Sequence, residues 1–262
     1  MSAPLAAVLS ERMEPRPEVT PELLQARQLL QRNDAKFCLP AERLLAVLEA
    51  CPREYAVLRA GGRPVATYRT KYFDTPELTS YHDHRRGRRR RCKVRVRHYL
   101  ERQVSFLEVK LKGARDSTAK TRWRREFLDG ELHPEDHDRL ARVAPSVAGS
   151  LRPVAETWFQ RLTLLGLEVC ERVTVDLALE LFPSAHPERL VALHGVAIVE
   201  VKQPRLDRQT PIMRALHAHR ARAMSMSKYC AAVALCVEGV RDNAFHANLR
   251  TIRAMNDAHD LR

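Results

Sequence analysis

The sequence predicts an α+β protein built on an eight-stranded antiparallel β-barrel with helices packed around it. Short segments alternate charged with apolar residues, as in Lys93-Val94-Arg95-Val96-Arg97. This two-residue period is that of a strand with one buried face. Roughly eight such segments follow one another with helical segments between them, which favours a closed antiparallel barrel over a parallel sheet. Most of the charged positions hold Lys or Arg, so strands that curl together would enclose a positive interior.

The individual elements follow from local signals. Pro40 fits the first turn of a helix, and Gly87 marks the bend before a basic strand. In chain order, strands are expected at 33–39, 64–73, from the bend at Gly87 to Tyr99, 104–112, 120–128, 154–165, 168–182 and 195–202. Helices are expected after Pro40, from the turn at 74–77, and at 134–143, 211–224 and 226–237.

Composition limits the class of protein and its compartment. The 262 residues carry a formal charge of +13, which implies an anionic partner. Six scattered cysteines without a Cys-x-x-Cys pair are typical of reduced thiols in a cytoplasmic protein. The longest apolar run, 231–237, is too short to span a bilayer. We expect a cytoplasmic protein with a flexible Pro- and Glu-rich N-terminal arm (1–28), one domain (29–240) and a C-terminal helical tail (241–262).

The repeated cationic strands indicate a ligand. Lys93, Arg95 and Arg97 share one face of their strand, and so do Lys110 with Lys112. One such strand is readily explained as a solvated basic stripe. Several in one sheet repel one another, which is unfavourable unless a ligand supplies negative charge. A polyanion is therefore the favoured partner.

The carboxylates among these cations leave two roles open. Glu200 and Lys202 project from the same side of one strand, so Glu200 is either an ion-pair partner or a ligand for Mg²⁺ or Mn²⁺ shared with phosphates. Glu108 is expected to hold neighbouring Lys and Arg side chains in place. His82 and His84 are expected to be a solvent-facing pair. No glycine-rich phosphate loop occurs, so any nucleotide would be gripped by side chains.

Seven segments together resemble a VTC domain, the polyphosphate polymerase domain of the vacuolar transporter chaperone type. This family belongs to the triphosphate tunnel metalloenzymes, which are related to the CYTH phosphatases. The resemblance covers about residues 32 to 240. In order, the segments are 68–76, 93–99, 106–110, 158–161, 172–176, 200–202 and 225–229.

The resemblance implies an eight-stranded tunnel in which a metal-dependent enzyme transfers the γ-phosphate of ATP to a polyphosphate chain. ATP and polyphosphate or tripolyphosphate would be its partners, with Mn²⁺ or Mg²⁺ held by Glu200. A separate membrane partner would be needed to translocate the product. The implied catalytic residues are Arg95, Arg97, Lys110, Arg161, Arg172 and Lys228. The implied substrate-binding residues are Lys36, Lys93, Lys120, Phe159 and Ser227.

Two departures from the family pattern bear on the reaction. The first strand reads Asn33-Asp34-Ala35-Lys36 where hydrolytic relatives have Glu-x-Glu-x-Lys, which favours transfer over hydrolysis. Phe159 keeps an aromatic ring but lacks a hydroxyl. A tripolyphosphate or nucleoside triphosphate hydrolase and a non-catalytic polyphosphate- or RNA-binding protein are the alternatives. We do not expect nucleic acid as the partner, because only 6% of residues are aromatic.

Overall fold

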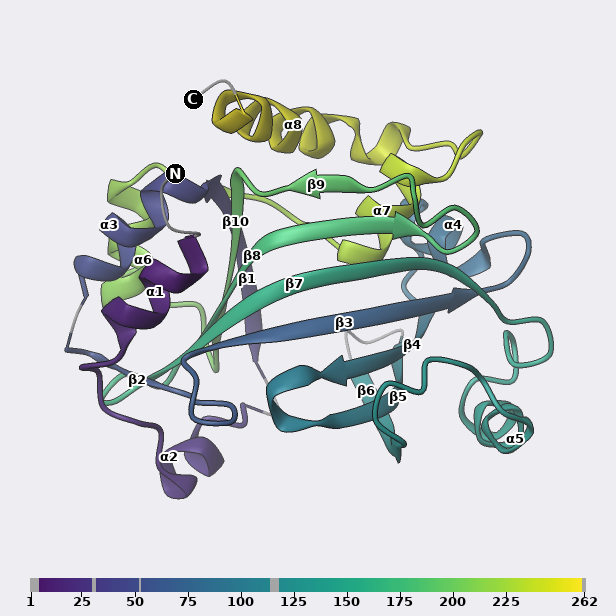
Figure 1. The fold of residues 1–262 in the computed structure, drawn as a ribbon, viewed down its shortest axis with the longest axis horizontal. Helices are drawn as coiled ribbons and strands as arrows, with labels where there is room; N and C mark the ends of the chain where they lie inside the picture. Colours follow the sequence, from purple (N-terminus) through teal and green to yellow (C-terminus); the bar gives the residue numbers. More distant parts are fainter. Residues whose placement is uncertain (1–4, 30–31, 52, 114–117, 261–262) are drawn as a thin grey trace.

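A computed structural model describes residues 5–29, 32–51, 53–113 and 118–260 (Figure 1). The strands are β1 Asn33–Pro40, β2 Tyr55–Val57, β3 Val65–Asp74, β4 Arg91–Tyr99, β5 Val104–Lys112, β6 Thr118–Arg125, β7 Arg152–Gly166, β8 Arg172–Pro183, β9 Val191–Leu193, β10 Val196–Gln203 and β11 Arg222–Ala223. The helices are α1 Leu5–Met13, α2 Pro21–Ala26, α3 Leu44–Glu49, α4 Thr79–Arg85, α5 Pro134–Val143, α6 Pro211–Ala218, α7 Lys228–Cys236 and α8 His246–Asp260, with 3₁₀ turns η1 Ala41–Arg43, η2 Leu100–Arg102 and η3 Asn243–Phe245.

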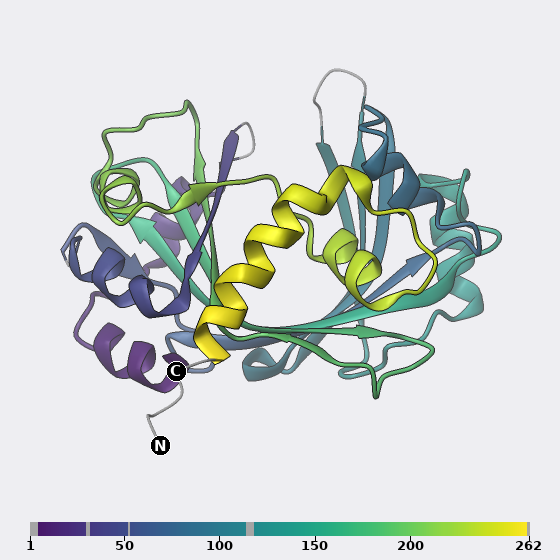
Figure 2. The ribbon, with the colours of Figure 1, turned by 90° about the horizontal axis from the view of Figure 1, so that it is seen from above.

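The strands form one strongly curved antiparallel sheet in the order β11-β1-β10-β8-β7-β3-β4-β5-β6, with β2 and β9 added to β7 and β8. Figure 2 shows how β1 and β10 stand on one side and β4 to β6 on the other, with β3, β7 and β8 between them. The expected antiparallel sheet with helices is thus confirmed. The closed barrel of eight strands is not: among the described residues the sheet has eleven strands, and its edge strands β6 and β11 do not pair with each other.

The extra strands explain the wrong strand count. β2, β9 and β11 have three, three and two residues, too few for a period-two pattern to be visible in the sequence. Helix α6 ends at Ala218, before the expected limit of 224, because Arg220 takes a left-handed conformation with φ 54° and the chain turns into β11. Helix α7 begins at Lys228, with the Ser227 side chain as its N-cap.

Helices α1, α3, α5 and α6 cover the outer face of the sheet, where most apolar strand residues point, whereas α7 packs on the inner face against Tyr72, Phe159 and Ile198. Val94 and Val96 are buried with Leu107 and Val109 against Leu140 of α5. A second cluster joins α1, α3 and α6 to β7, β8 and β10, and a third joins α7 and α8 to β7 to β10. The alternation read from the sequence therefore separates an apolar outer face from an inner face that is charged except where α7 packs on it.

The N-terminal segment 1–28, which the sequence predicts to be a flexible arm, forms helices in its described residues. Its described residues contain α1 and α2, and α1 buries Leu9 and Met13 in the core. Arg16 donates hydrogen bonds to the carbonyls of Leu48 and Cys51 at 2.6 and 3.1 Å. The Pro and Glu content predicted disorder, but Leu9 and Met13 lie one helical turn apart and form an apolar stripe. Residues 1–4 lie outside the described residues.

The C-terminal segment contains α8, which buries Leu249 and Ile252 against the sheet and α7. The domain limits themselves remain a prediction. None of the helices that the structure describes combines the length and apolar character needed to cross a lipid bilayer.

Candidate anion-binding site

One face of the sheet collects the cations that the sequence singled out. Residues directly opposite each other in antiparallel strands point to the same side of a sheet. The pairs Lys36–Glu200, Arg161–Asp176 and Lys93–Lys110 are opposite in this sense. Continuing the register from β1 to β6 traces a single surface, which we call the cationic face. Its charged members are Asp34, Lys36, Glu200, Lys202, Arg172, Asp176, Arg161, Arg97, Arg95, Lys93, Glu108, Lys110, Lys112, Lys120, Arg122 and Arg124, with Arg91 at its edge.

The segment before α7 ties the two sides of the curved sheet together. The Lys36 ammonium on β1 donates to the Met226 carbonyl at 3.2 Å, and the Lys93 ammonium on β4 donates to the Ser227 hydroxyl at 2.8 Å. Lys228 pairs with Asp176 on β8. Strands far apart in the sheet thus bring their cations to one segment, and Lys228 joins the cationic face although it lies on a helix.

Asp176 fixes two of these cations. Arg161 donates from Nε and Nη2 to its two oxygens at 2.5 and 2.7 Å, and Lys228 pairs with the same carboxylate. Burial opposes the charge on Asp176, but Arg161 and Lys228 outweigh it and hold its pKa below the usual range. Asp176 is therefore ionised at neutral pH and orients an arginine and a lysine from different elements.

Glu108 does the same on the other side of the sheet. Arg95 donates to it from Nε at 2.8 Å and from Nη2 at 2.6 Å, and Lys120 pairs with its second oxygen. Glu108 is only 1% exposed. Burial works against its charge, yet Arg95, Arg97 and Lys120 lower its pKa. The expected role of Glu108 in holding neighbouring cations is confirmed.

Glu200 serves a third pair of cations. It pairs with Lys202 beside it and with Lys36 across the strands at 3.5 Å. Although burial raises it, the pKa of Glu200 falls to about 2 because of Lys202 and Lys36. The ion-pair role is thus present in the structure.

The metal role of Glu200 depends on the donors around it. Asp34 lies opposite Lys202 and pairs with Arg32 at 2.8 Å. The described residues contain no group of three or more side chains that could cage a metal ion. The donor set fits a Mg²⁺ or Mn²⁺ ion held by one or two carboxylates together with phosphate oxygens, and it does not fit a site made by protein alone.

Other cations of the face have no carboxylate of their own. Arg97 donates to the Thr70 hydroxyl at 3.0 Å, and Lys93 to that of Ser227. Lys110 and Arg172 have no hydrogen-bond or ion-pair partner among the described residues. Burial, then the charge of Lys36, lowers the pKa of Lys110, while burial and Arg161 lower that of Arg172. Burial beside other cations therefore disfavours the charged forms of Lys110 and Arg172.

The pKa of Lys93 is lowered for the same two reasons. Burial is the main reason that it falls to about 8, with contributions from Lys36 and Lys110.

An aromatic group lies beneath the cations at β3 and β7. Phe159 is 1% exposed and stacks on Tyr68 with a centroid distance of 5.2 Å. The Lys228 ammonium lies 4.5 Å from the centre of the Phe159 ring, and the Arg161 guanidinium 5.2 Å from it. The ring thus supports two cations. Direct contact between Phe159 and a substrate stays a prediction.

The structure brings together every candidate residue read from the sequence, and their catalytic and binding roles stay predictions. Lys202 and Tyr68 belong to the same face but were not among the candidates. Their signal was present: Lys202 follows Glu200 by two residues, and Tyr68 pairs with Phe159 in the register of β3 and β7. Two cavities in the described part of the chain, of about 600 and 650 Å³, lie elsewhere, between α1 and α3 and beside α5.

Comparison with known proteins assigns this chain, with its antiparallel sheet and cationic face, to a family. The model of the VTC domain family matches residues 31–237. The chain therefore belongs to the VTC domain family. The resemblance predicted from the sequence is confirmed over nearly the same residues.

Similar solved structures include a provisionally assigned adenylate cyclase from Bacillus halodurans, with 11% identity, 75% of this chain and 94% of that chain covered, and a TM-score of 0.48. A provisionally assigned adenylyl cyclase from Hippeastrum with a dominant triphosphatase activity shares 12% identity over 80% of this chain and 98% of that one, with a TM-score of 0.48. A conserved hypothetical protein from Pyrococcus furiosus shares 11% identity over 76% and 99%, with a TM-score of 0.42. No curated protein matches the chain. The family model alone carries the assignment.

Proposed function

We propose that this protein is an ATP-dependent polyphosphate polymerase that transfers the γ-phosphate of ATP to the end of a polyphosphate chain. One observation carries the proposal: the cationic face holds more Lys and Arg than its carboxylates neutralise. Lys93, Lys110 and Arg172 in particular have no carboxylate partner among the described residues. Membership of the VTC domain family supports the same reaction.

The reaction asks the protein for positioning and charge neutralisation. A terminal oxygen of the polyphosphate forms a bond to the γ-phosphorus as the bond from that phosphorus to the β,γ-bridging oxygen breaks, and ADP leaves. The attacking oxygen is already anionic, so no general base is needed. Transition-state charge develops on the transferred phosphoryl group, where fixed guanidinium and ammonium groups stabilise it. Arg161, Lys228 and Arg95 suit this role because carboxylates already hold them in place.

A divalent ion would be held by Glu200 together with phosphate oxygens. When bound, it would neutralise part of the charge on the phosphates. Glu200 faces Lys36 and Lys202, so the same carboxylate also sets the position of two ammonium groups next to the phosphates. The scarcity of carboxylates beside it favours transfer over hydrolysis, because nothing on β1 corresponds to a second acidic ligand except Asp34.

Incubation of the purified protein with ATP and Mn²⁺ tests the proposal. A ladder of long polyphosphate on a gel, with ADP formed in equal amounts to the phosphate incorporated, is the expected result. Glu200→Gln should abolish the ladder while tripolyphosphate still binds. Release of inorganic phosphate without a ladder would instead make the protein a hydrolase, and binding of tripolyphosphate without any turnover would make it a non-catalytic binder.

A further inference from the structure

A run of arginines joins α4 to β4 and has no part in the proposed reaction. Residues 85–91 are all arginine except Gly87. Gly87 has φ 67°, its N–H donates to the His84 carbonyl at 3.1 Å, and the Arg88 N–H donates to the Asp83 carbonyl at 2.9 Å. This pair of bonds is a Schellman motif, which requires a left-handed residue where glycine stands. The run therefore leaves the helix in a defined direction.

Both ends of the run lie beside the cationic face. Arg91 precedes Lys93 by two residues on β4, so it points to the same side of the sheet. At the other end, His84 has its pKa lowered to about 3 by burial and then by Lys93 and Arg91. These charges act on His84 because α4 packs against β4. The run thus continues the row formed by Arg97, Arg95 and Lys93.

The positive charge of the run is largely unopposed. Arg86, Arg89 and Arg90 are exposed and have no acidic partner among the described residues. Arg88 pairs with Asp83 at 3.1 Å. The His84 Nδ1 atom is enclosed and has no hydrogen-bond partner within the described protein. Adjacent exposed arginines repel one another, so an anionic ligand would stabilise this arrangement.

We propose that Arg86, Arg89, Arg90 and Arg91 form a second binding site for linear polyphosphate, which holds the part of a long chain that extends beyond the cationic face. The inference rests on the proposed function and adds a preference for long chains over short ones. The run contains neither an aromatic residue on which a base could stack nor an apolar residue that could enter a membrane. A flexible chain with one charge per phosphate fits a row of cations that continues from the face.

Binding measurements on the full chain can separate the two sites. The variant Arg89→Gln/Arg90→Gln removes two charges from the run. Arg43→Gln/Arg53→Gln is the matched control, because both arginines are exposed and lie beside α3, at the opposite end of the sheet from α4 (Figures 1 and 2). Affinities for inorganic tripolyphosphate and for a long linear polyphosphate would be measured by titration calorimetry over a series of salt concentrations.

The run variant should bind long polyphosphate about 3- to 10-fold more weakly than the unaltered protein, as expected for two exposed charge contacts. Its plot of log affinity against log salt should lose about 1.4 in slope, the value for two contacts with a single-stranded polyanion. Tripolyphosphate affinity should stay within about 2-fold in both variants. The control should match the unaltered protein with both ligands.

Equal losses for tripolyphosphate and long polyphosphate, or equal losses in the control, would overturn the second site and leave the cationic face in place. A run variant that keeps its affinity for long polyphosphate but loses affinity for single-stranded RNA or anionic vesicles would reassign the run to that partner. If the unaltered protein binds no tripolyphosphate, the proposed function itself fails and the second site fails with it.

Discussion

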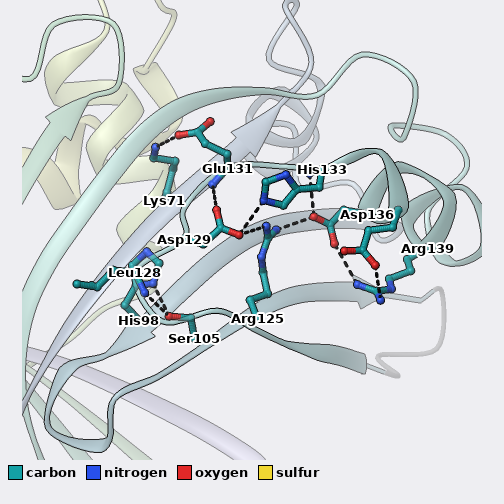
Figure 3. A network of polar contacts seen from close by, with 11 residues as sticks. Lys71, His98, Ser105, Arg125, Leu128, Asp129, Glu131, His133, Asp136 and Arg139 are labelled. Carbon is teal, nitrogen blue, oxygen red and sulfur yellow. Dashed lines mark hydrogen bonds and ion pairs between the residues drawn. The ribbon is translucent and has the colours of Figure 1, made fainter.

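The two faces of strand β6 both carry cations paired with carboxylates, but they differ in the number of carboxylates available to each cation. On the outer face, Arg125 is 4% exposed at its side chain and pairs with Asp136 at 2.6 Å and Asp129 at 2.5 Å (Figure 3). On the inner face, Lys120 shares the single carboxylate of Glu108 with Arg95. Arg125 thus has two carboxylate partners, whereas Arg95 and Lys120 have one between them.

The same contrast holds beyond β6. In the outer network, Arg139 meets both Asp136 and Glu135, and Lys71 meets both Glu131 and Glu156. Asp136 also accepts from the His133 N–H at the start of α5. In the outer network the carboxylates neutralise the cations without any ligand, so this network has a structural role. The cationic face lacks those acids, which is the arrangement expected where a ligand supplies the missing charge.

The largest expected effect is loss of stability from the outer network. Arg125→Met would leave Asp129 and Asp136 without their shared cation, and the free energy of unfolding should fall by about 3–5 kcal/mol, as for a broken buried ion pair. Urea denaturation measures this. Arg124→Met is the control, because Arg124 is exposed on the inner side of the same strand and should cost less than about 0.5 kcal/mol. Equal costs would remove the distinction between the two faces.

On the cationic face, a guanidinium and an ammonium at the same position should differ in their effect on turnover and phosphate binding. Arg95→Lys keeps the charge but loses the two-nitrogen contact with Glu108, so it should reduce turnover or tripolyphosphate binding by about 1.5–3 kcal/mol, the value for a charge-assisted hydrogen bond. Changing Arg88 and Arg89 to Lys should be nearly silent in a tripolyphosphate titration. If the two changes have the same effect, the face acts as a general positive surface.

Removing an acid from the cationic face should have an effect that ligand reverses. Glu108→Gln leaves Arg95 and Lys120 without their carboxylate, and the ligand-free protein should lose about 1–3 kcal/mol of stability. Tripolyphosphate should bind this variant more tightly and restore its melting temperature. Glu131→Gln in the outer network, 66% exposed at its side chain, should change neither quantity. A loss at Glu108 that tripolyphosphate leaves uncorrected would contradict a phosphate site.

The smallest expected effect is on pH dependence. Because burial lowers the pKa of Lys93 to about 8, and a bound phosphate favours its charged form, affinity should fall as pH rises through 8. The arginine of Lys93→Arg stays charged over this range. Relative to that variant, the unaltered protein should lose at most about 10-fold in affinity per pH unit. The ligand-free protein should instead gain stability between pH 8 and the ordinary lysine pKa of 10.5, since only the unfolded chain holds the proton there. Parallel curves for both proteins would exclude this contribution of Lys93.

Much of the fold and most of the site could be predicted from the sequence, because period two fixes which side of a strand each residue takes. Lys93, Arg95 and Arg97 lie together for that reason. The number of strands could not be predicted, because β2 and β11 exist only through pairing with β7 and β1. The partners of Asp176 were also out of reach, since Lys228 comes from a helix 52 residues away. The sequence predicts the side of the sheet on which a residue lies, and only the fold shows which carboxylate pairs with which cation.

A crystal structure of the protein soaked with tripolyphosphate and Mn²⁺ tests the central claim most directly. The account predicts a phosphate chain on the cationic face, with oxygens in hydrogen-bond contact with Lys93, Lys110 and Arg172, and with the metal ion between the phosphates and Glu200. Phosphates bound only at other surfaces, with the carboxylate pairs of Asp176 and Glu108 unchanged and these three cations still without a ligand, would contradict it.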